Sequence, residues 1–223
     1  FSSRRRHTRW CVRSRGLGDV YKRQISPYSE PGSGSSFDRG VDILHEVAEF
    51  GPIGTEPHLL EAVELGASDL ARAASEALFA AQVEEYLSTG KLVCVSEGPV
   101  NREPWFVYQG FQIGKDQDPW TFETLNPSPR FKTKGFIRAV DMLNSKAAFL
   151  WNVYRPGEYS DLLIERVREK AKVSSLGFSP GVFSVTGNSD HAYSDINTNG
   201  VILQAIAYRL NGRKPCIDWN PKG

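Results

Sequence analysis

The residues best suited to chemistry lie in SEGPVNREPWFVYQG, residues 96–110. Glu97 precedes a Gly-Pro turn, and Trp105 and Tyr108 follow within a dense run of aromatic residues. A carboxylate beside aromatic rings suits carbohydrate, whose C–H faces stack on rings while its hydroxyls need charged or amide partners. This pattern makes Glu97 a candidate catalytic acid, with Trp105, Tyr108 and the later Trp120 as stacking surfaces. Packing of the same aromatics in a core stays open as the alternative.

Glycoside hydrolysis needs a second carboxyl group facing the same bond, about 5–9.5 Å from the first. Several acidic residues are available as the partner of Glu97, and the sequence does not choose among Glu103, Asp116, Asp118 and Asp195.

A second polar motif is DINTNG, residues 195–200. Asn197 or Thr198 is expected to cap the last helix by accepting hydrogen bonds from free backbone N–H groups. Capping accounts for one polar residue, whereas a helix N-terminus also offers a place to hold polar ligand groups. We therefore keep Asp195, Asn197 and Asn199 as candidate ligand-binding residues beside the capping interpretation.

Lys146 lies in the apolar helical pattern NSKAAFLW. A lysine there usually extends toward solvent or pairs with a surface acid. In a pocket it would pair with Glu97 or bind an anionic ligand. Both interpretations stay open.

No metal or cofactor is expected. The histidines and the three cysteines show no metal-ligand spacing. The sequence also has no P-loop, GxGxxG or GxSxG motif, which disfavours nucleotide and serine-triad chemistry.

The elements that must position these residues are predominantly helical. Apolar periodicity and stop signals predict helices at 37–50, from Pro57 to Gly66, and at 68–90, 144–154, 158–173 and 198–210. Between them, 91–114 reads as β-rich, 115–135 as a polar loop around Trp120, and 177–188 as a short extended or hairpin segment. The predicted buried faces are Leu70, Ala74, Ala77, Leu78, Ala81 and Leu87 in the long helix, and Ile202, Ile206 and Leu210 in the last.

The N-terminal prefix differs from the rest. Residues 2–24 carry seven Arg and one Lys against one Asp, whereas the whole chain has a net charge of +1. SSRRRHTR and DVYKRQ resemble translated read-through of a sequencing adapter, so we expect residues 1–24 to be non-native and the true N-terminus to be missing. An Arg-rich nucleic-acid-binding arm is the alternative, but the acidic remainder disfavours a nucleic-acid partner.

Beyond the prefix, we expect a loop at 25–36 and a single domain at 37–223. No apolar run approaches the about 20 residues of a membrane span, so no span is expected. Residues 1–24 also lack the apolar core of a signal peptide.

Five motifs occur in an order that resembles a bacterial family of domains of unknown function. They are Tyr86 with Thr89-Gly90, Ser96-Glu97, Pro104 to Tyr108, Ser145 to Phe149, and Asn197-Thr198-Asn199. That family is built as an (α/α) toroid similar to glucoamylase-like and cyclic-glucan-processing enzymes. The resemblance covers about residues 75–215 and implies a mainly α fold of toroid-like helical hairpins with short β segments in the loops, incomplete at the N-terminus.

The resemblance implies a carbohydrate-active or carbohydrate-binding domain, with glycoside hydrolysis as the activity to expect of the former. It also implies a glucan or other oligosaccharide as ligand and a location in the periplasm or cell envelope. Glu97 would be the acid, and Asn197 and Asn199 would bind hydroxyls. One departure is Ser184, which stands where the family pattern has an acid. It favours the alternative of a non-catalytic structural or glycan-sensing envelope module, in which Trp105 and Tyr108 are buried in the core.

Overall fold

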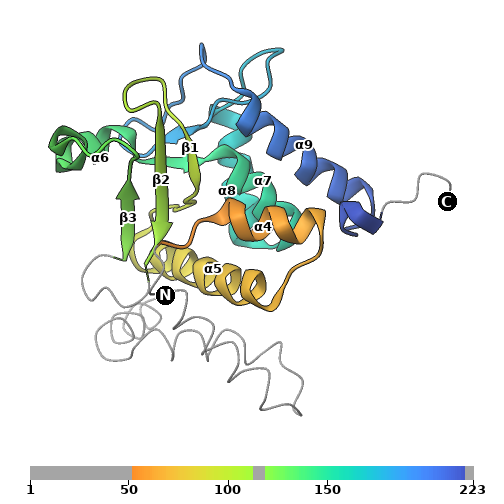
Figure 1. Ribbon diagram of the computed structural model, residues 1–223. Helices are drawn as coiled ribbons and strands as arrows, with labels where there is room; N and C mark the ends of the chain where they lie inside the picture. The colour runs from red at the N-terminus through yellow and green to blue at the C-terminus, as the bar shows by residue number, and fades with distance from the viewer. Residues whose placement is uncertain (1–51, 113–118, 219–223) are drawn as a thin grey trace, which may run out of the picture.

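A computed structural model describes residues 52–112 and 119–218. Within these ranges the chain forms six α-helices, five short strands and two 3-10 segments (Figure 1). The predicted non-native prefix 1–24, the loop 25–36 and the helix 37–50 lie outside the described residues.

The first two helices form a close pair joined by a short turn (Figure 1). They are α4 (Thr55–Glu64) and α5 (Asp69–Thr89), which confirms both predicted helices. Ser68 caps α5 by accepting from the Ala71 N–H at 3.1 Å, and Gly90 ends it in the left-handed conformation. The predicted buried face was wrong at its two ends, because Leu70 and Leu87 are 43% and 61% exposed. Ala74, Ala77 and Leu78 of the predicted face are buried, and the buried face also includes Ala71, Ala73 and Ala80. These small residues let neighbouring elements approach closely.

A three-stranded antiparallel sheet follows, in the order β1 (Glu97–Pro99), β2 (Phe106–Phe111), β3 (Trp120–Glu123). The predicted polar loop around Trp120 was wrong, because this residue begins β3 and pairs with Phe111. The two rings also pack with centroids 5.6 Å apart. A helix that the sequence did not predict, α6 (Lys134–Val140), follows after Thr133 as its cap.

The C-terminal half centres on α7 (Ser145–Tyr154). Helices α4, α8 (Glu158–Lys170) and α9 (Ile196–Leu210) pack against it (Figure 1). The indole N–H of Trp151, fully buried in α7, donates to Thr55 Oγ1 at 3.1 Å and thereby fixes α4. The strand β4 (Met142–Asn144) directly precedes α7 and pairs antiparallel with β5 (Gly181–Phe183), which follows α8. The strand β5 confirms the short extended segment predicted in 177–188.

The last helix starts earlier than the pattern predicted. Asp195, and not Asn197 or Thr198, is its N-cap, because the helix begins at Ile196. Its predicted apolar face is buried only at Ile202, whereas Ile206 and Leu210 are 39% and 82% exposed. The buried face is rotated toward Val201, Ala205 and Tyr208, and the helix packs against both α7 and α4.

The mainly α fold class is confirmed for the described residues. Their six helices do not make up the twelve of a closed six-hairpin toroid. None of the described helices combines the length and apolar character needed to cross a membrane.

Candidate functional site

Lys146 is the centre of the candidate site. It lies in the first turn of α7 and its side chain is fully buried. Its ammonium forms an ion pair with the Glu56 carboxylate, which is itself 7% exposed, and donates to Asn197 Oδ1 at 2.6 Å. Glu56 lies in the first turn of α4 and Asn197 in the first turn of α9. One buried cation therefore holds the beginnings of three helices together.

Backbone anchoring brings Glu97 to the same place. Asn144 caps α7 by accepting from the Ala147 N–H at 3.2 Å, and its Nδ2 donates to the Glu97 carbonyl at 3.3 Å. On the other side, the Glu56 N–H donates to Ser96 Oγ at 3.2 Å. The segment that ends in Glu97 is thus attached to both α4 and α7.

The position of Lys146 is costly for the fold. A cation in the first turn of a helix opposes the helix dipole, and burial removes its hydration. Because apolar residues of similar volume often serve stability as well as a buried ion pair, stability alone is a weak reason for this arrangement.

The charges of Glu56 and Lys146 both act on the pKa of the Glu97 carboxyl group. Glu97 is half-buried at the start of β1. Burial raises the pKa of Glu97, the negative charge of Glu56 raises it further, and the Lys146 ammonium opposes both effects. The protonated form of Glu97 therefore persists to higher pH than in an exposed glutamate, as a general acid requires.

The sheet register adds aromatic and acidic neighbours. Glu97 is paired directly with Tyr108, which in turn is paired with Glu123 on β3. Directly paired residues of an antiparallel sheet point to the same face, so these three side chains share one face. Tyr108 is half-buried, and its ring packs on Phe106 with centroids 5.3 Å apart.

Trp105 lies at the end of the β1–β2 loop with its side chain 62% exposed. Its backbone has φ 69°, a left-handed conformation that is rare for a bulky residue. Such strain is typical of functional positions. If these aromatic residues only packed in the core, Trp105 and Tyr108 would both be fully buried, and neither is.

Two other candidate residues have structural roles. Asp195 Oδ1 accepts from the Thr198 N–H at 2.7 Å as the cap of α9. Asn199 accepts from the Phe178 N–H at 2.9 Å, while its Nδ2 donates to the carbonyls of Phe178 and Asp195 and to Ser194 Oγ. Because its amide is occupied by loop 177–195, Asn199 fixes that loop to α9.

The remaining predicted residues lie away from the cluster. Trp120 is three positions along the ladder from the Tyr108 pair and packs against the core. Among the candidate second carboxylates, Glu103 is exposed and paired with Arg130. Asp116 and Asp118 lie outside the described residues.

Sequence reasoning missed Glu56. An acidic residue in the first turn of a helix is ordinary because it complements the helix dipole, so the sequence carried no signal for its role. Within the described ranges, no group of three or more His, Cys, Asp or Glu side chains is arranged to hold a metal.

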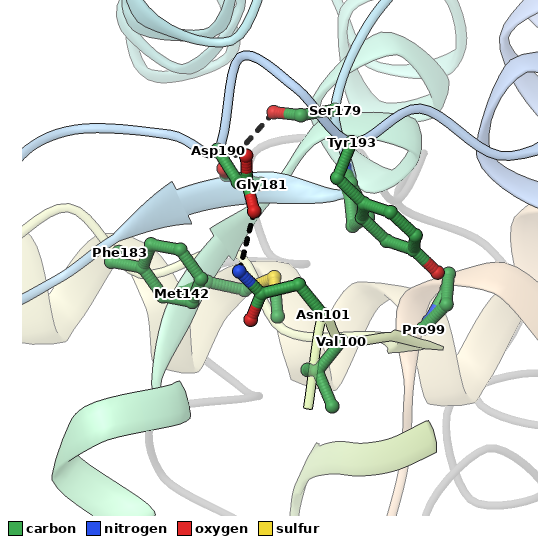
Figure 2. Close-up of a pocket in the computed structure, with 10 residues that line it drawn as sticks. Pro99, Val100, Asn101, Met142, Ser179, Gly181, Phe183, Asp190 and Tyr193 are labelled. Atoms are coloured by element: carbon green, nitrogen blue, oxygen red, sulfur yellow. Dashed lines mark hydrogen bonds between the residues drawn. The ribbon is translucent and has the colours of Figure 1, made fainter. Parts of the chain in front are cut away.

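A small cavity lies at the end of β1, where Pro99 is one of its lining residues (Figure 2). It has room for roughly one water molecule between Pro99 to Asn101 and Ser179 to Phe183. Asn101 Nδ2 donates to Asp190 Oδ2 at 2.5 Å across its edge. Burial and the charges of Asp195 and Asp190 raise the pKa of Tyr193, which also lines the cavity. These contacts attach the β1–β2 loop to the loop that precedes α9.

Fold and site together define a mainly helical domain with a lysine–glutamate cluster beside a small antiparallel sheet. The chain belongs to the family described as Protein of unknown function (DUF3131), whose model matches residues 33–212. Neither a curated protein nor a solved structure matches the chain.

Proposed function

We propose that this domain binds an oligosaccharide, of the glucan class, and that Glu97 is the general acid that cleaves a glycosidic bond in it. One observation carries the proposal: a half-buried carboxyl group with a raised pKa lies on a sheet face that also presents Tyr108. A glycoside hydrolase needs such a proton donor next to a surface on which a sugar ring can stack.

The charge balance of the cluster favours a neutral ligand. The ammonium of Lys146 is fully buried and neutralised by Glu56, so it is not available as a binding site for an anion. Its role is to hold Glu56 and Asn197 in place beside Glu97. The amide N–H₂ of Asn197, which is exposed, then suits a sugar hydroxyl.

Trp105 is a second aromatic side chain available to a ligand near the sheet. It lies just before β2, three residues from Tyr108, and is 62% exposed. We propose Trp105 as the stacking platform of a second sugar ring of the same chain.

We further propose that the described helices are part of an (α/α) toroid in a cell-envelope protein. Consecutive helices pack as pairs, α4 with α5 and α7 with α8. The outer face of α9 is apolar and exposed at Ile196, Leu203 and Leu210, as expected for a helix that has a further layer beside it.

Calorimetric titration of the full chain with maltohexaose, cellohexaose, laminarihexaose and a linear β-1,2-glucan tests the binding. We expect one linkage class to bind, and Trp105→Ala to weaken that binding about 5- to 10-fold through loss of stacking. Leu125→Ala, which truncates another exposed side chain, is the matched control and should bind like the wild type. Absence of binding to all four glycans would overturn the proposal.

A non-catalytic glycan-sensing module is the second candidate, in a form that keeps Trp105 at the surface and not in the core. It is favoured by Ser184, which follows β5 where the family pattern has an acid. This candidate predicts binding of one glycan without release of new reducing ends, and the same affinity for Glu97→Gln.

A further inference from the structure

A row of three side chains crosses the sheet on one face. Its members are Glu97 on β1, Tyr108 on β2 and Glu123 on β3, each paired directly with the next. Tyr108 is therefore flanked by two carboxylates.

The spacing of this row is set by the sheet. Neighbouring strands lie about 4.8 Å apart, so the Cα atoms of Glu97 and Glu123 are roughly 9.6 Å apart. Carboxyl groups of inverting glycosidases are about 6.5–9.5 Å apart, which leaves room for a water molecule, whereas retaining enzymes need about 5–5.5 Å. The Cα spacing fixes only where the two side chains start: their carboxyl groups reach the inverting range when the side chains lean slightly toward each other, and the retaining range only when both close over Tyr108.

The two carboxyl groups have different surroundings. Glu97 is half-buried beside Glu56 and Lys146, and burial raises its pKa. Glu123 is exposed at the end of β3. The first environment favours a proton donor and the second a carboxylate in contact with water. Glu56, the other nearby acid, is excluded as the base because its carboxylate is buried against Lys146.

We propose that Glu123 is the general base of the reaction whose acid is Glu97, and that hydrolysis across Tyr108 inverts the anomeric configuration. This inference rests on the proposed function. The Glu97 carboxyl gives its proton to the glycosidic oxygen as the bond from that oxygen to the anomeric carbon breaks. Glu123 takes a proton from a solvent water, whose oxygen bonds to the anomeric carbon from the opposite face. Glu97 ends as a carboxylate and Glu123 as an acid, and proton exchange with solvent restores both.

The experiment measures hydrolysis by the full chain on the glycan that it binds. Release of reducing ends gives the rate, and proton NMR of the first product gives its anomeric configuration. Glu97→Gln and Glu123→Gln should each lower kcat by roughly 10²- to 10⁴-fold. Glu165→Gln, an exposed glutamate on α8, should leave kcat unchanged. Azide should restore turnover to Glu123→Gly by attacking the anomeric carbon directly and giving an inverted glycosyl azide.

The outcomes separate this inference from the proposed function. Wild-type kcat in Glu123→Gln, or a retained configuration in the product, overturns Glu123 as the base while glycan cleavage stands. Binding without hydrolysis also overturns it and leaves only the binding part of the proposal. Absence of binding removes both. Rescue by azide with inversion supports the assignment, because a purely structural role for Glu123 would not respond to a small nucleophile.

Discussion

At the scale of single residues, Glu97 is an ionisable side chain in a partly buried place, which is unfavourable for the stability of the fold. Its carboxyl group is placed in surroundings that disfavour its ionised form, first by burial and then by the charge of Glu56. An exposed glutamate would cost the fold nothing at neutral pH. The fold therefore gives up stability at this position, as proteins commonly do at functional sites.

Removing the titrating group should recover that stability. A carboxyl whose pKa is raised on folding stabilises the folded state below its unfolded pKa, and this contribution is lost as the pH rises through the folded pKa. We expect Glu97→Gln to raise the midpoint of thermal unfolding by about 1–4 °C at pH 8, with the gain shrinking toward pH 4. Thermal unfolding followed by circular dichroism across this pH range measures it.

The matched control for this prediction is Glu165→Gln, since Glu165 is exposed on α8. It should change the midpoint little at any pH. A Glu97→Gln protein that is less stable than the wild type at pH 8 would contradict the assigned environment of Glu97.

The buried pair Lys146–Glu56 should show strong coupling. Lys146→Met leaves the Glu56 carboxylate buried without its cation, which should cost about 3–5 kcal/mol in the free energy of unfolding. Lys146→Met combined with Glu56→Gln should recover at least half of that loss. Urea unfolding of the wild type, both single variants and the double variant completes the cycle. Additive losses would show that the two side chains do not interact.

At the residue scale, the sequence predicted which residues are candidates for the site better than it predicted which side chains they contact. Glu97 and Lys146 stood out because a carboxylate among aromatics and a lysine in an apolar helix are conspicuous in the sequence itself. Glu56 did not, because its partner lies far along the chain and only packing of α4 on α7 brings the two together. Asn199 also stood out in the sequence, but its side chain has the structural role of anchoring loop 177–195 to α9.

At the scale of elements, Asn144 connects the helix that carries Lys146 to the strand that carries Glu97. Its two hydrogen bonds are separable, because the acceptor caps α7 and the donor binds the Glu97 carbonyl. Asn144→Ala should cost about 1–2 kcal/mol of unfolding free energy through loss of the cap. Asn144→Ser keeps a capping oxygen and should recover much of that cost. If urea unfolding gave both variants the same loss of unfolding free energy, the cap would not be the source of that loss.

The end of α5 provides a second test at this scale. Gly90 has φ 76° with open space around it, so Gly90→Ala adds backbone strain without a clash and should cost about 1 kcal/mol. Gly135 in α6 also has open space but an ordinary helical backbone, so Gly135→Ala should instead stabilise by about 0.5–1 kcal/mol. The same sign for both variants in urea unfolding would contradict this account.

The predicted element boundaries agree with the structure where a capping or stop residue fixes the end of a helix. The cap Ser68 and the stop Gly90 fixed α5, and Asn144 fixed the start of α7. Prediction failed where tertiary contacts decide. β3 forms because Trp120 pairs with Phe111 across a segment that reads as polar loop, and the buried faces of α5 and α9 are set by their neighbours.

At the scale of the whole molecule, the site is made by packing that no local pattern encodes. Helices α4, α7 and α9 each contribute one residue near their beginning, and the sheet contributes Glu97. Because these segments are far apart in the sequence, the sequence alone predicted the candidate residues but not which of them meet.

The most direct test of the central claim is thermal unfolding of the full chain with and without the four glycans. A ligand that binds only the folded state raises the midpoint by mass action, by about 2.7 kcal/mol of stability at one hundred times its Kd. We predict that one linkage class raises the midpoint of the wild type and that Trp105→Ala reduces this shift, while Leu125→Ala does not. A cooperative transition that none of the four glycans moves would contradict the assignment of this face as a carbohydrate site.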